Sequence, residues 1–189
     1  MQINLSTHPP DLQKHKCLVL GCFSDEKPPR GACGLIDWRL NSLISREIKQ
    51  GHINGEFQEK VIIPFPGRIN ADFLFLFGLG GLSDISYDRM YNAAYEIAGA
   101  VDALKFQEFS FDLPGDGRSK LNAAGMLEAM ITGFFDCLSR DIRKLDAMNI
   151  CLITSSDRLD EVARGIAQFK KNVKHSETVD CSALQPHFT

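Results

Sequence analysis

The sequence predicts an α/β protein with three layers, α/β/α, in which a mixed, mainly parallel sheet carries helices on both faces. Short apolar runs typical of buried strands alternate with longer segments whose apolar residues recur at helical spacing. Glycine-rich turns join these segments. The length of 189 residues suits one core, so we expect a single domain over residues 1–175 and an irregular tail over residues 176–189.

Six apolar runs predict the strands. They occupy residues 3–6, 17–23, 61–65, 73–77, 109–113 and 150–154. The connection between the runs at 61–65 and 73–77 is too short for a crossover helix, so we expect these two strands to be antiparallel. The first run, at residues 3–6, is expected at an edge of the sheet.

Apolar stripes at helical spacing predict the helices. Residues 35–50 are expected to form a single amphipathic helix, which Gly51 ends in the left-handed conformation. A helix with Ser86 as its N-cap follows, and then a long helix that reaches Ile142 after a cap at Ser119 or Asn122. A last helix covers residues 159–169. The aromatic residues expected in the core are Trp38, Phe134 and Phe135.

Composition excludes several classes of protein. Hydrophobic residues make up 44% of the chain and charged residues 24%, with 21 basic and 24 acidic side chains and a net charge of -3. No global field attracts nucleic acid, and no apolar run approaches the length of a membrane helix. The N-terminus lacks the pattern of an export signal, so we expect a cytoplasmic location and reduced, mostly buried cysteines. Histidine and cysteine spacing predicts no metal site, and no cofactor is expected.

The loop before the helix predicted at residue 35 is the first candidate ligand site. A glycine-bearing turn from strand to helix presents unpaired backbone N–H groups that can hold an anion. The candidate residues of this loop are Lys27, Arg30, Gly31 and Gly34. The alternative, which we rank first, is that the glycines only permit a tight turn.

Two later loops provide further candidates. Gly78, Gly80 and Gly81 could approach a phosphate, although a plain backbone turn is the favoured role because the full dinucleotide fingerprint is absent. The segment L-P-G-D-G-R-S-K fails the spacing of a phosphate loop, and it is either an ordinary turn or one rim of a cleft. The residues of that rim are Asp112, Asp116 and Arg118.

A nucleophile is a weaker hypothesis. Cys33 is near a predicted helix N-terminus, where a thiolate is stabilised. No histidine is adjacent to it in sequence, and a partner that is close only in space stays open.

A family resemblance runs through most of the chain. The segment CLVLGCFSDEKPPRGACGLIDWRLNSLISREIKQGHINGEFQEKVIIPFPGRINADFLFLFGLGG and the later helix AAGMLEAMITGFFDCLSRD resemble the N-terminal domain of the leucyl aminopeptidase (M17) family. The places of the family's polar stretch, proline-bearing strand and G-L-G turn are taken by Gly55-Glu56, Pro64 and Gly78-Leu79-Gly80. The resemblance covers roughly residues 5–174 and implies a macro-domain-like fold.

The same resemblance limits the function that we expect. In the family, two metals are held in a C-terminal domain around an N-T-D-A-E-G-R-L segment, which this sequence lacks. We therefore carry over no catalytic residue and expect a non-catalytic role in assembly, regulation or ligand binding. The alternative is a nucleotide or ADP-ribose-binding macro-like module, and nucleic-acid binding ranks last. The expected partners are a second copy, a protein of the aminopeptidase family or a small anionic ligand.

Overall fold

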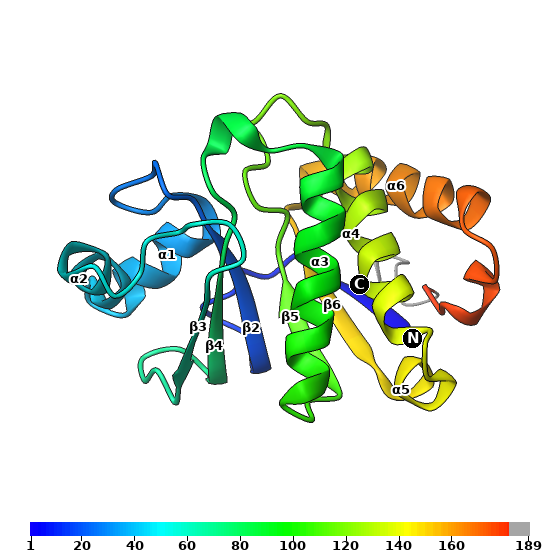
Figure 1. The fold of residues 1–189 in the computed structure, drawn as a ribbon, viewed down its shortest axis with the longest axis horizontal. Helices are drawn as coiled ribbons and strands as arrows, with labels where there is room; N and C mark the ends of the chain where they lie inside the picture. The colour runs from blue at the N-terminus through cyan, green and yellow to red at the C-terminus, as the bar shows by residue number, and fades with distance from the viewer. Residues whose placement is uncertain (182–189) are drawn as a thin grey trace.

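The computed structural model describes residues 1–181, which form one six-stranded sheet flanked by helices (Figure 1). The strands are β1 (Gln2–Ser6), β2 (His15–Cys22), β3 (Lys60–Pro64), β4 (Ala71–Gly78), β5 (Glu108–Phe111) and β6 (Asn149–Ile153). The helices are α1 (Gly31–Arg39), α2 (Leu43–Gln50), α3 (Tyr87–Ala103), α4 (Ala123–Leu138), α5 (Ile142–Ala147) and α6 (Leu159–Asn172). Short 3₁₀ turns lie before α3, before α6 and after α6, at Leu82–Asp84, Ser156–Arg158 and Ser176–Thr178.

The sheet has the mixed, mainly parallel character that the sequence predicts. Its strand order is β1-β6-β5-β2-β4-β3, and every neighbouring pair is parallel except β3 with β4. The antiparallel pair sets Ile62 opposite Phe75, which confirms the predicted pairing of these two runs. β1 lies at one edge beside β6, also as predicted.

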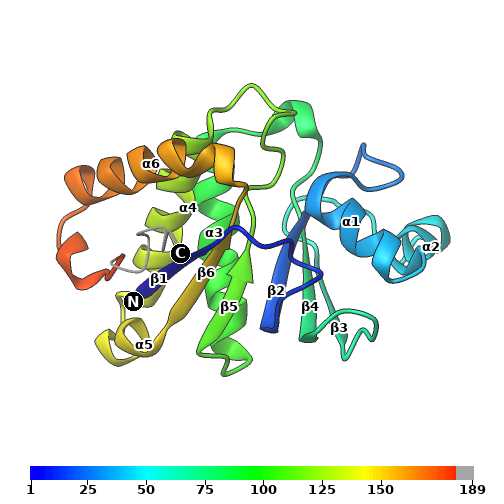
Figure 2. The same cartoon turned by 180° about the vertical axis from the view of Figure 1, so that it is seen from behind.

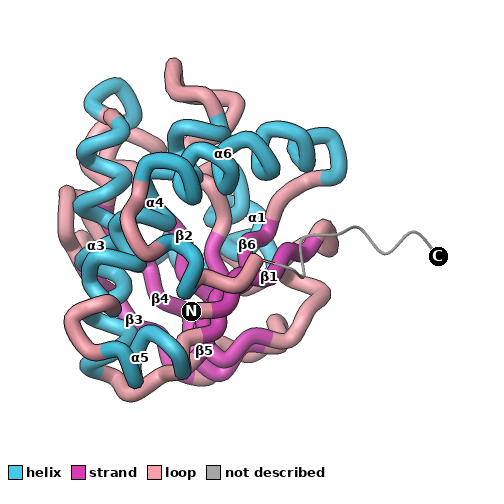
Figure 3. Tube along the Cα trace, turned by 90° about the vertical axis from the view of Figure 1, so that its right-hand side faces the viewer, coloured by secondary structure: helices cyan, strands magenta, loops and turns pink. Residues whose placement is uncertain are grey.

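Two hydrophobic clusters fill the two faces of the sheet, because side chains alternate along each strand. On β2, Val19 packs into the larger cluster with α3, α4 and α6, whereas Leu18 and Leu20 pack into the smaller cluster with α1 and Ile44 of α2. Figure 1 and the view from behind in Figure 2 show the two sides of the sheet, and Figure 3 shows β2 and β4 between α3 and α1. Helices on both faces are therefore confirmed.

The single helix predicted for residues 35–50 is wrong, because the chain forms α1 and α2 there. Asn41 and Ser42 lie between them with φ angles of 56° and 58°, values that interrupt a right-handed helix. Asp37 supplies the physical reason for the break. Its buried carboxylate accepts hydrogen bonds from Ser45 N at 2.9 Å and from Ser45 Oγ at 2.5 Å, which satisfies the start of α2.

The helix ends agree with the predicted caps in three places. Gly51 follows α2 with a φ of 80°, in the left-handed conformation. Ser86 accepts a hydrogen bond from Arg89 N before α3, and Asn122 accepts one from Gly125 N before α4. These side chains satisfy backbone N–H groups that a helix start leaves without partners.

The long helix predicted to reach Ile142 is wrong at its end. α4 ends at Leu138, and the Asp141 carboxylate accepts a hydrogen bond from Arg143 N at 3.0 Å to begin α5. Ile142 is the first residue of α5 and is 55% exposed, so it does not extend the stripe of α4.

One of the three predicted core aromatics is on the surface. Phe134 and Phe135 are buried, but Trp38 is 68% exposed, so its assignment to the core is wrong. The buried face of α1 is formed by Cys33, Ile36 and Asp37. Trp38 is not part of that face and instead carries the guanidinium of Arg39 at 4.9 Å from its ring centroid.

The described part of the C-terminal tail runs beside β1. Asp180 accepts a hydrogen bond from Ile3 N at 2.7 Å and donates its own N–H to Met1 O at 2.9 Å. The rest of the predicted tail, residues 182–189, lies outside the described residues. Among the described residues, the helices are all too short or too polar to cross a membrane.

Candidate functional site

A small cleft opens at the carboxyl ends of β5 and β6, beside the start of α1. Loops at the carboxyl ends of parallel strands are the usual ligand positions of open α/β sheets. The cleft has a volume of about 190 Å³. Its lining residues are Gly31, Ala32, Asp112, Leu113, Asp116, Arg118, Ile153, Thr154 and Ser155.

The start of α1 forms one wall of this cleft. Arg30 is the N-cap and its side chain makes no capping hydrogen bond, so the first N–H groups of the helix lack a side-chain partner. Gly31 has a φ of 62° and lies close to Arg118, whose Nη2 atom is 3.0 Å from the position that a Cβ atom would take. The positive φ favours glycine here, and the arrangement brings a guanidinium to the helix start.

Ion pairs join the loops around the cleft. Arg118 pairs with Glu26 of the loop after β2, and its guanidinium lies 5.7 Å from the ring centroid of Phe23. Asp116 pairs with Arg158 at 3.2 Å, so the loop after β5 is also tied to the loop after β6. The arginines next to the cleft are therefore already neutralised by carboxylates.

Two cations of the same region are unpaired within residues 1–181. Lys27 and Arg30 are exposed on the loop between β2 and α1, and neither makes an ion pair there. They do not line the cleft itself, but they lie on the loop that leads into α1. Among the described residues, no ion pair offsets the charge of either side chain.

Asp112 is the most perturbed carboxyl group of the cleft. It follows the last residue of β5, and burial raises its pKa from 3.8 to about 6. Its own backbone N–H and the nearby Arg118 lower the pKa, while Asp116 raises it, and burial outweighs them all. The charged form of Asp112 therefore lowers the stability of the folded protein.

The glycine loop after β4 lies outside the cleft lining, and its backbone groups are used within the fold. Gly80 N donates to Gly55 O at 2.8 Å, and Leu79 N donates to Cys22 O at 2.9 Å. A Cβ atom on Gly78 would collide with Glu56 O, so close backbone packing requires that glycine. The Asp25 carboxylate accepts the N–H of Leu82 at 3.0 Å, which places a negative charge beside this loop.

The predicted candidates are thus brought together only in part. Gly31, Asp116 and Arg118 line the cleft, together with Asp112. The other candidates do not line it; they are Lys27, Arg30, Gly34, Gly78, Gly80 and Gly81. A Cβ atom on Gly34 would lie 2.5 Å from Pro29 O, so this glycine permits close packing of the loop on α1.

Sequence reasoning missed several cleft residues. Thr154 and Ser155 follow β6 directly, and the rule that ligands gather at strand ends would have found them. Ala32 could have been found from its place in the first turn of α1. Arg158 gave no signal, because its role comes from a contact with Asp116 that only the fold creates.

Cys33 does not have the surroundings of an activated nucleophile. Its Sγ atom lies 3.3 Å from Cys22 Sγ, and both residues are buried. The hydrogen bond to Cys22 and burial raise the pKa of Cys33 well above that of a free thiol, which is opposite to the depressed pKa of a reactive thiol. Within residues 1–181, there is no group of three or more side chains that could hold a metal ion.

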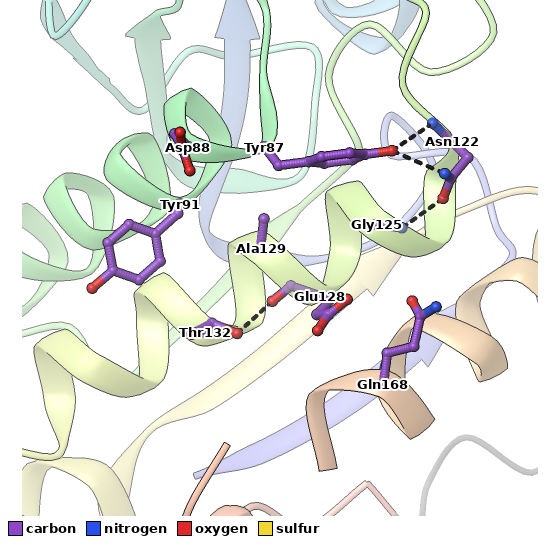
Figure 4. A pocket seen from close by; sticks show the side chains of 9 residues that line it. All are labelled: Tyr87, Asp88, Tyr91, Asn122, Gly125, Glu128, Ala129, Thr132 and Gln168. Atoms are coloured by element: carbon purple, nitrogen blue, oxygen red, sulfur yellow. Dashed lines mark hydrogen bonds between the residues drawn. The ribbon is translucent and has the colours of Figure 1, made fainter. Parts of the chain in front are cut away.

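A second, wider hollow of about 450 Å³ lies on the surface formed by α3, α4 and α6 (Figure 4). The ring of Tyr87 lies across the start of α4, and its hydroxyl accepts a hydrogen bond from Asn122 Nδ2 at 2.9 Å. Gly125 makes this possible, because a Cβ atom there would lie 2.6 Å from the ring. The hollow has carboxylates from Asp88 and Glu128 but no cationic lining residue, so it is less suited to an anion than the cleft.

Solved structures define the class of this fold. The chain is similar to a macrodomain from Oceanobacillus iheyensis, with a TM-score of 0.70, 10% identity and coverage of 91% of this chain and 93% of the other. A Trypanosoma brucei macrodomain in complex with ADP-ribose gives a TM-score of 0.70 and 14% identity, over 88% of this chain and 68% of that one. A variant of tomato leucine aminopeptidase gives a TM-score of 0.60 and 18% identity, over 87% of this chain and 35% of that one. The fold is therefore macrodomain-like.

Sequence comparison gives the family. Residues 19–143 match the N-terminal domain of the cytosol aminopeptidase family, and the chain belongs to that family. It is 30% identical over 112 residues to a probable cytosol aminopeptidase of Sulfurihydrogenibium sp. (strain YO3AOP1), and 34% identical over 110 residues to one of Burkholderia orbicola (strain MC0-3). These matches cover 59% and 56% of this chain but only 22% of each relative.

Proposed function

We propose that this macrodomain-like domain is a non-catalytic binding module that holds a small anionic ligand of the nucleoside diphosphate class. The observation that carries the proposal is the cleft at the carboxyl ends of β5 and β6, where the start of α1 meets Arg118. Helix N-termini and guanidinium groups are both suited to phosphate oxygens. The similar Trypanosoma brucei domain is in complex with ADP-ribose, which makes this compound the first ligand to test.

The charges around the cleft support an anion that reaches beyond its present volume. Lys27 and Arg30 are exposed and unpaired within residues 1–181, and they lie on the loop that precedes α1. A diphosphate would replace Glu26 as the partner of Arg118 and would gain the charge of these two side chains. Binding by such exchange of ion pairs is expected to weaken as salt increases.

The proposal that the domain is non-catalytic rests on the part of the family's proteins that this chain matches. The sequence match is to the N-terminal domain and covers 22% of each aminopeptidase relative. Purified chain should therefore leave leucyl chromogenic substrates intact in the presence of manganese, zinc or cobalt. Turnover that follows the protein through purification and is lost on chelation would contradict this part.

Calorimetry tests the ligand. ADP-ribose and ADP should bind, inorganic phosphate should bind far more weakly, and Arg118→Gln should reduce affinity about tenfold or more, the range for losing a charge-assisted hydrogen bond. Arg143→Gln is the matched control, because the Arg143 side chain is 88% exposed on α5 and its one ion pair within residues 1–181 is with Asp141. No heat with either nucleotide at millimolar concentration would contradict ligand binding.

Assembly is the second candidate, and the exposed Trp38 favours it. Tryptophan is enriched at protein interfaces, and this one is 68% exposed next to Arg39. Light scattering during size exclusion should show an oligomer that Trp38→Ala weakens. A monomer at every concentration would contradict self-assembly and leave the ligand hypothesis intact.

A further inference from the structure

A pair of buried thiols lies where β2 ends and α1 begins. Cys22 is the last residue of β2, and Cys33 is the third residue of α1. Their Sγ atoms are 3.3 Å apart, and the two residues are only 4% and 3% exposed. Neither the proposed ligand nor peptide hydrolysis uses these thiols.

The pair stands apart from the other cysteines of the described chain. Cys22 and Cys33 both belong to the smaller hydrophobic cluster, on the face of the sheet that α1 and α2 cover. Cys17 and Cys181 belong to the cluster on the opposite face, and Cys137 lies on α4. Within residues 1–181, no other pair of sulfur atoms is in hydrogen-bond contact.

We propose that Cys22 and Cys33 form a reversible disulfide that ties the start of α1 to the end of β2. A disulfide requires sulfur atoms about 2.05 Å apart, so the two atoms must approach by roughly 1.2 Å from their present 3.3 Å. Rotation of the two side chains would have to supply this shift. The crosslink would close a chain loop over residues 22–33, which carries Glu26, Lys27 and Arg30.

The oxidant named by this proposal is a hydroperoxide, here hydrogen peroxide. One thiolate attacks a peroxide oxygen, the O–O bond breaks, and a sulfenic acid and water result. The second thiolate then attacks the sulfenic sulfur, an S–S bond forms, and the oxygen leaves as a second water. The two thiols thus lose two electrons and two protons, and the peroxide is reduced to two waters.

The surroundings of the pair make the reaction slow while the loop is closed. The contact between the two thiols and their burial raise the pKa of Cys33, and the carboxylates of Asp112 and Asp37 act in the same direction. The loop that joins the two cysteines is tied to the segment after β5 by the ion pair between Glu26 and Arg118. Opening of this loop admits the oxidant, so Glu26→Gln should react faster than the unchanged chain.

Peptide mapping of the folded chain after peroxide treatment tests the proposal. The free thiols are first alkylated, the protein is digested without reductant, and the fragments are identified by mass spectrometry. We expect a peptide that joins Cys22 to Cys33, with two hydrogen atoms fewer than the reduced pair, and its loss after dithiothreitol. Oxidation of other cysteines while Cys22 and Cys33 stay reduced would overturn the proposal.

Stability and two matched variants give independent readouts. Closing this short loop should raise Tm by about 5–10 °C on oxidation, if the crosslink fits the folded state. Cys33→Ala should abolish the shift, and Cys137→Ala, which removes a half-buried cysteine on α4, should retain it. A crosslink that lowers Tm would show that the folded state must be distorted to form it, and would overturn the proposal even if the Cys33→Ala protein failed to fold.

Discussion

Asp112 offers the sharpest test of how the cleft is built. Burial raises the pKa of its carboxyl from 3.8 to about 6, a rise of about 2 pH units. Each unit corresponds to about 1.4 kcal/mol between the folded and unfolded states. The charged form of Asp112 therefore destabilises the fold by up to about 3 kcal/mol at neutral pH, and Asp112→Asn should recover about 1–3 kcal/mol of it.

The sign of the pH dependence follows from the direction of this change. Because the folded-state pKa is above the unfolded one, the protonated carboxyl stabilises the folded protein fully below pH 4, and this contribution is lost as pH rises through 6. The free energy of unfolding of Asp112→Asn should thus equal that of the unchanged chain near pH 4. The variant should become the more stable protein as pH rises above about 4, and the difference should reach its full size above about pH 6.

Urea denaturation between pH 4 and pH 8 measures this difference. The subtraction of the two proteins removes the contribution of titrating groups that do not interact with Asp112. Asp116→Asn is the control, because Asp116 has an ion pair with Arg158 and its replacement should lower stability by less than about 1 kcal/mol. A difference that does not change with pH, or an Asp112→Asn protein that is less stable at pH 8, would refute the burial argument.

Three further predictions concern the scaffold. Asp37→Ala removes both hydrogen bonds with Ser45 and should lower the free energy of unfolding, measured in urea, by about 1–3 kcal/mol. A free energy of unfolding within about 0.5 kcal/mol of that of the unchanged chain would contradict the capping role of Asp37. Gly133→Ala should lower the free energy of unfolding by about 1–3 kcal/mol, because its Cβ atom would meet the backbone of Tyr91. Gly125→Ala should change that free energy by less than about 1 kcal/mol, because the half-exposed Tyr87 ring can move. Equal losses for the two variants in thermal denaturation would contradict this contrast. The buried His15 ring is hydrogen-bonded with Ser110 Oγ and Pro10 O, and burial lowers its pKa. The contribution of neutral His15 to the stability of the fold should therefore be lost as pH falls below about 6.5. An NMR titration midpoint at or above about 6.5 would contradict this prediction.

Most of the strands and the one antiparallel pair could be anticipated because they depend on local signals, whereas the strand order depends on distant pairings and was not predicted. The run at residues 17–23 is apolar on both faces, as a central parallel strand must be, and the short connection before residue 73 allows only an antiparallel pair. The helix caps at Ser86 and Asn122 depend on neighbours within three residues. Patterns formed by residues close together in the chain can be recognised from a single sequence.

The errors arise where a distant or unusual contact decides the structure. The apolar stripe of residues 35–50 continues through the break between α1 and α2, so its period conceals the capping of Ser45 by Asp37. Trp38 was expected in the core because it lies beside that stripe, but α1 turns its other face to the sheet. Hydrophobic periodicity identifies a helical face without showing where a cap interrupts it.

The candidate site shows the same division. Gly31, Asp116 and Arg118 could be selected because they lie in loops between strand and helix. The charged candidates pair with residues that are distant in sequence. Arg118 pairs with Glu26, which precedes it by 92 positions, and Asp116 pairs with Arg158, which follows it by 42. No sequence spacing predicts such pairs.

The state of the arginines determines how a ligand must bind. Arg118 and Arg158 already have carboxylate partners in Glu26 and Asp116, so a phosphate gains only the difference between its own interactions and those that it displaces. Glu26 also lies on the loop that joins Cys22 to Cys33. The proposed ligand binding and the proposed disulfide thus both involve this loop, and an anion that replaces Glu26 should change the rate at which the two thiols react. A nucleotide that binds the cleft yet leaves that rate unchanged would separate the two sites and show that Arg118 keeps its original partner.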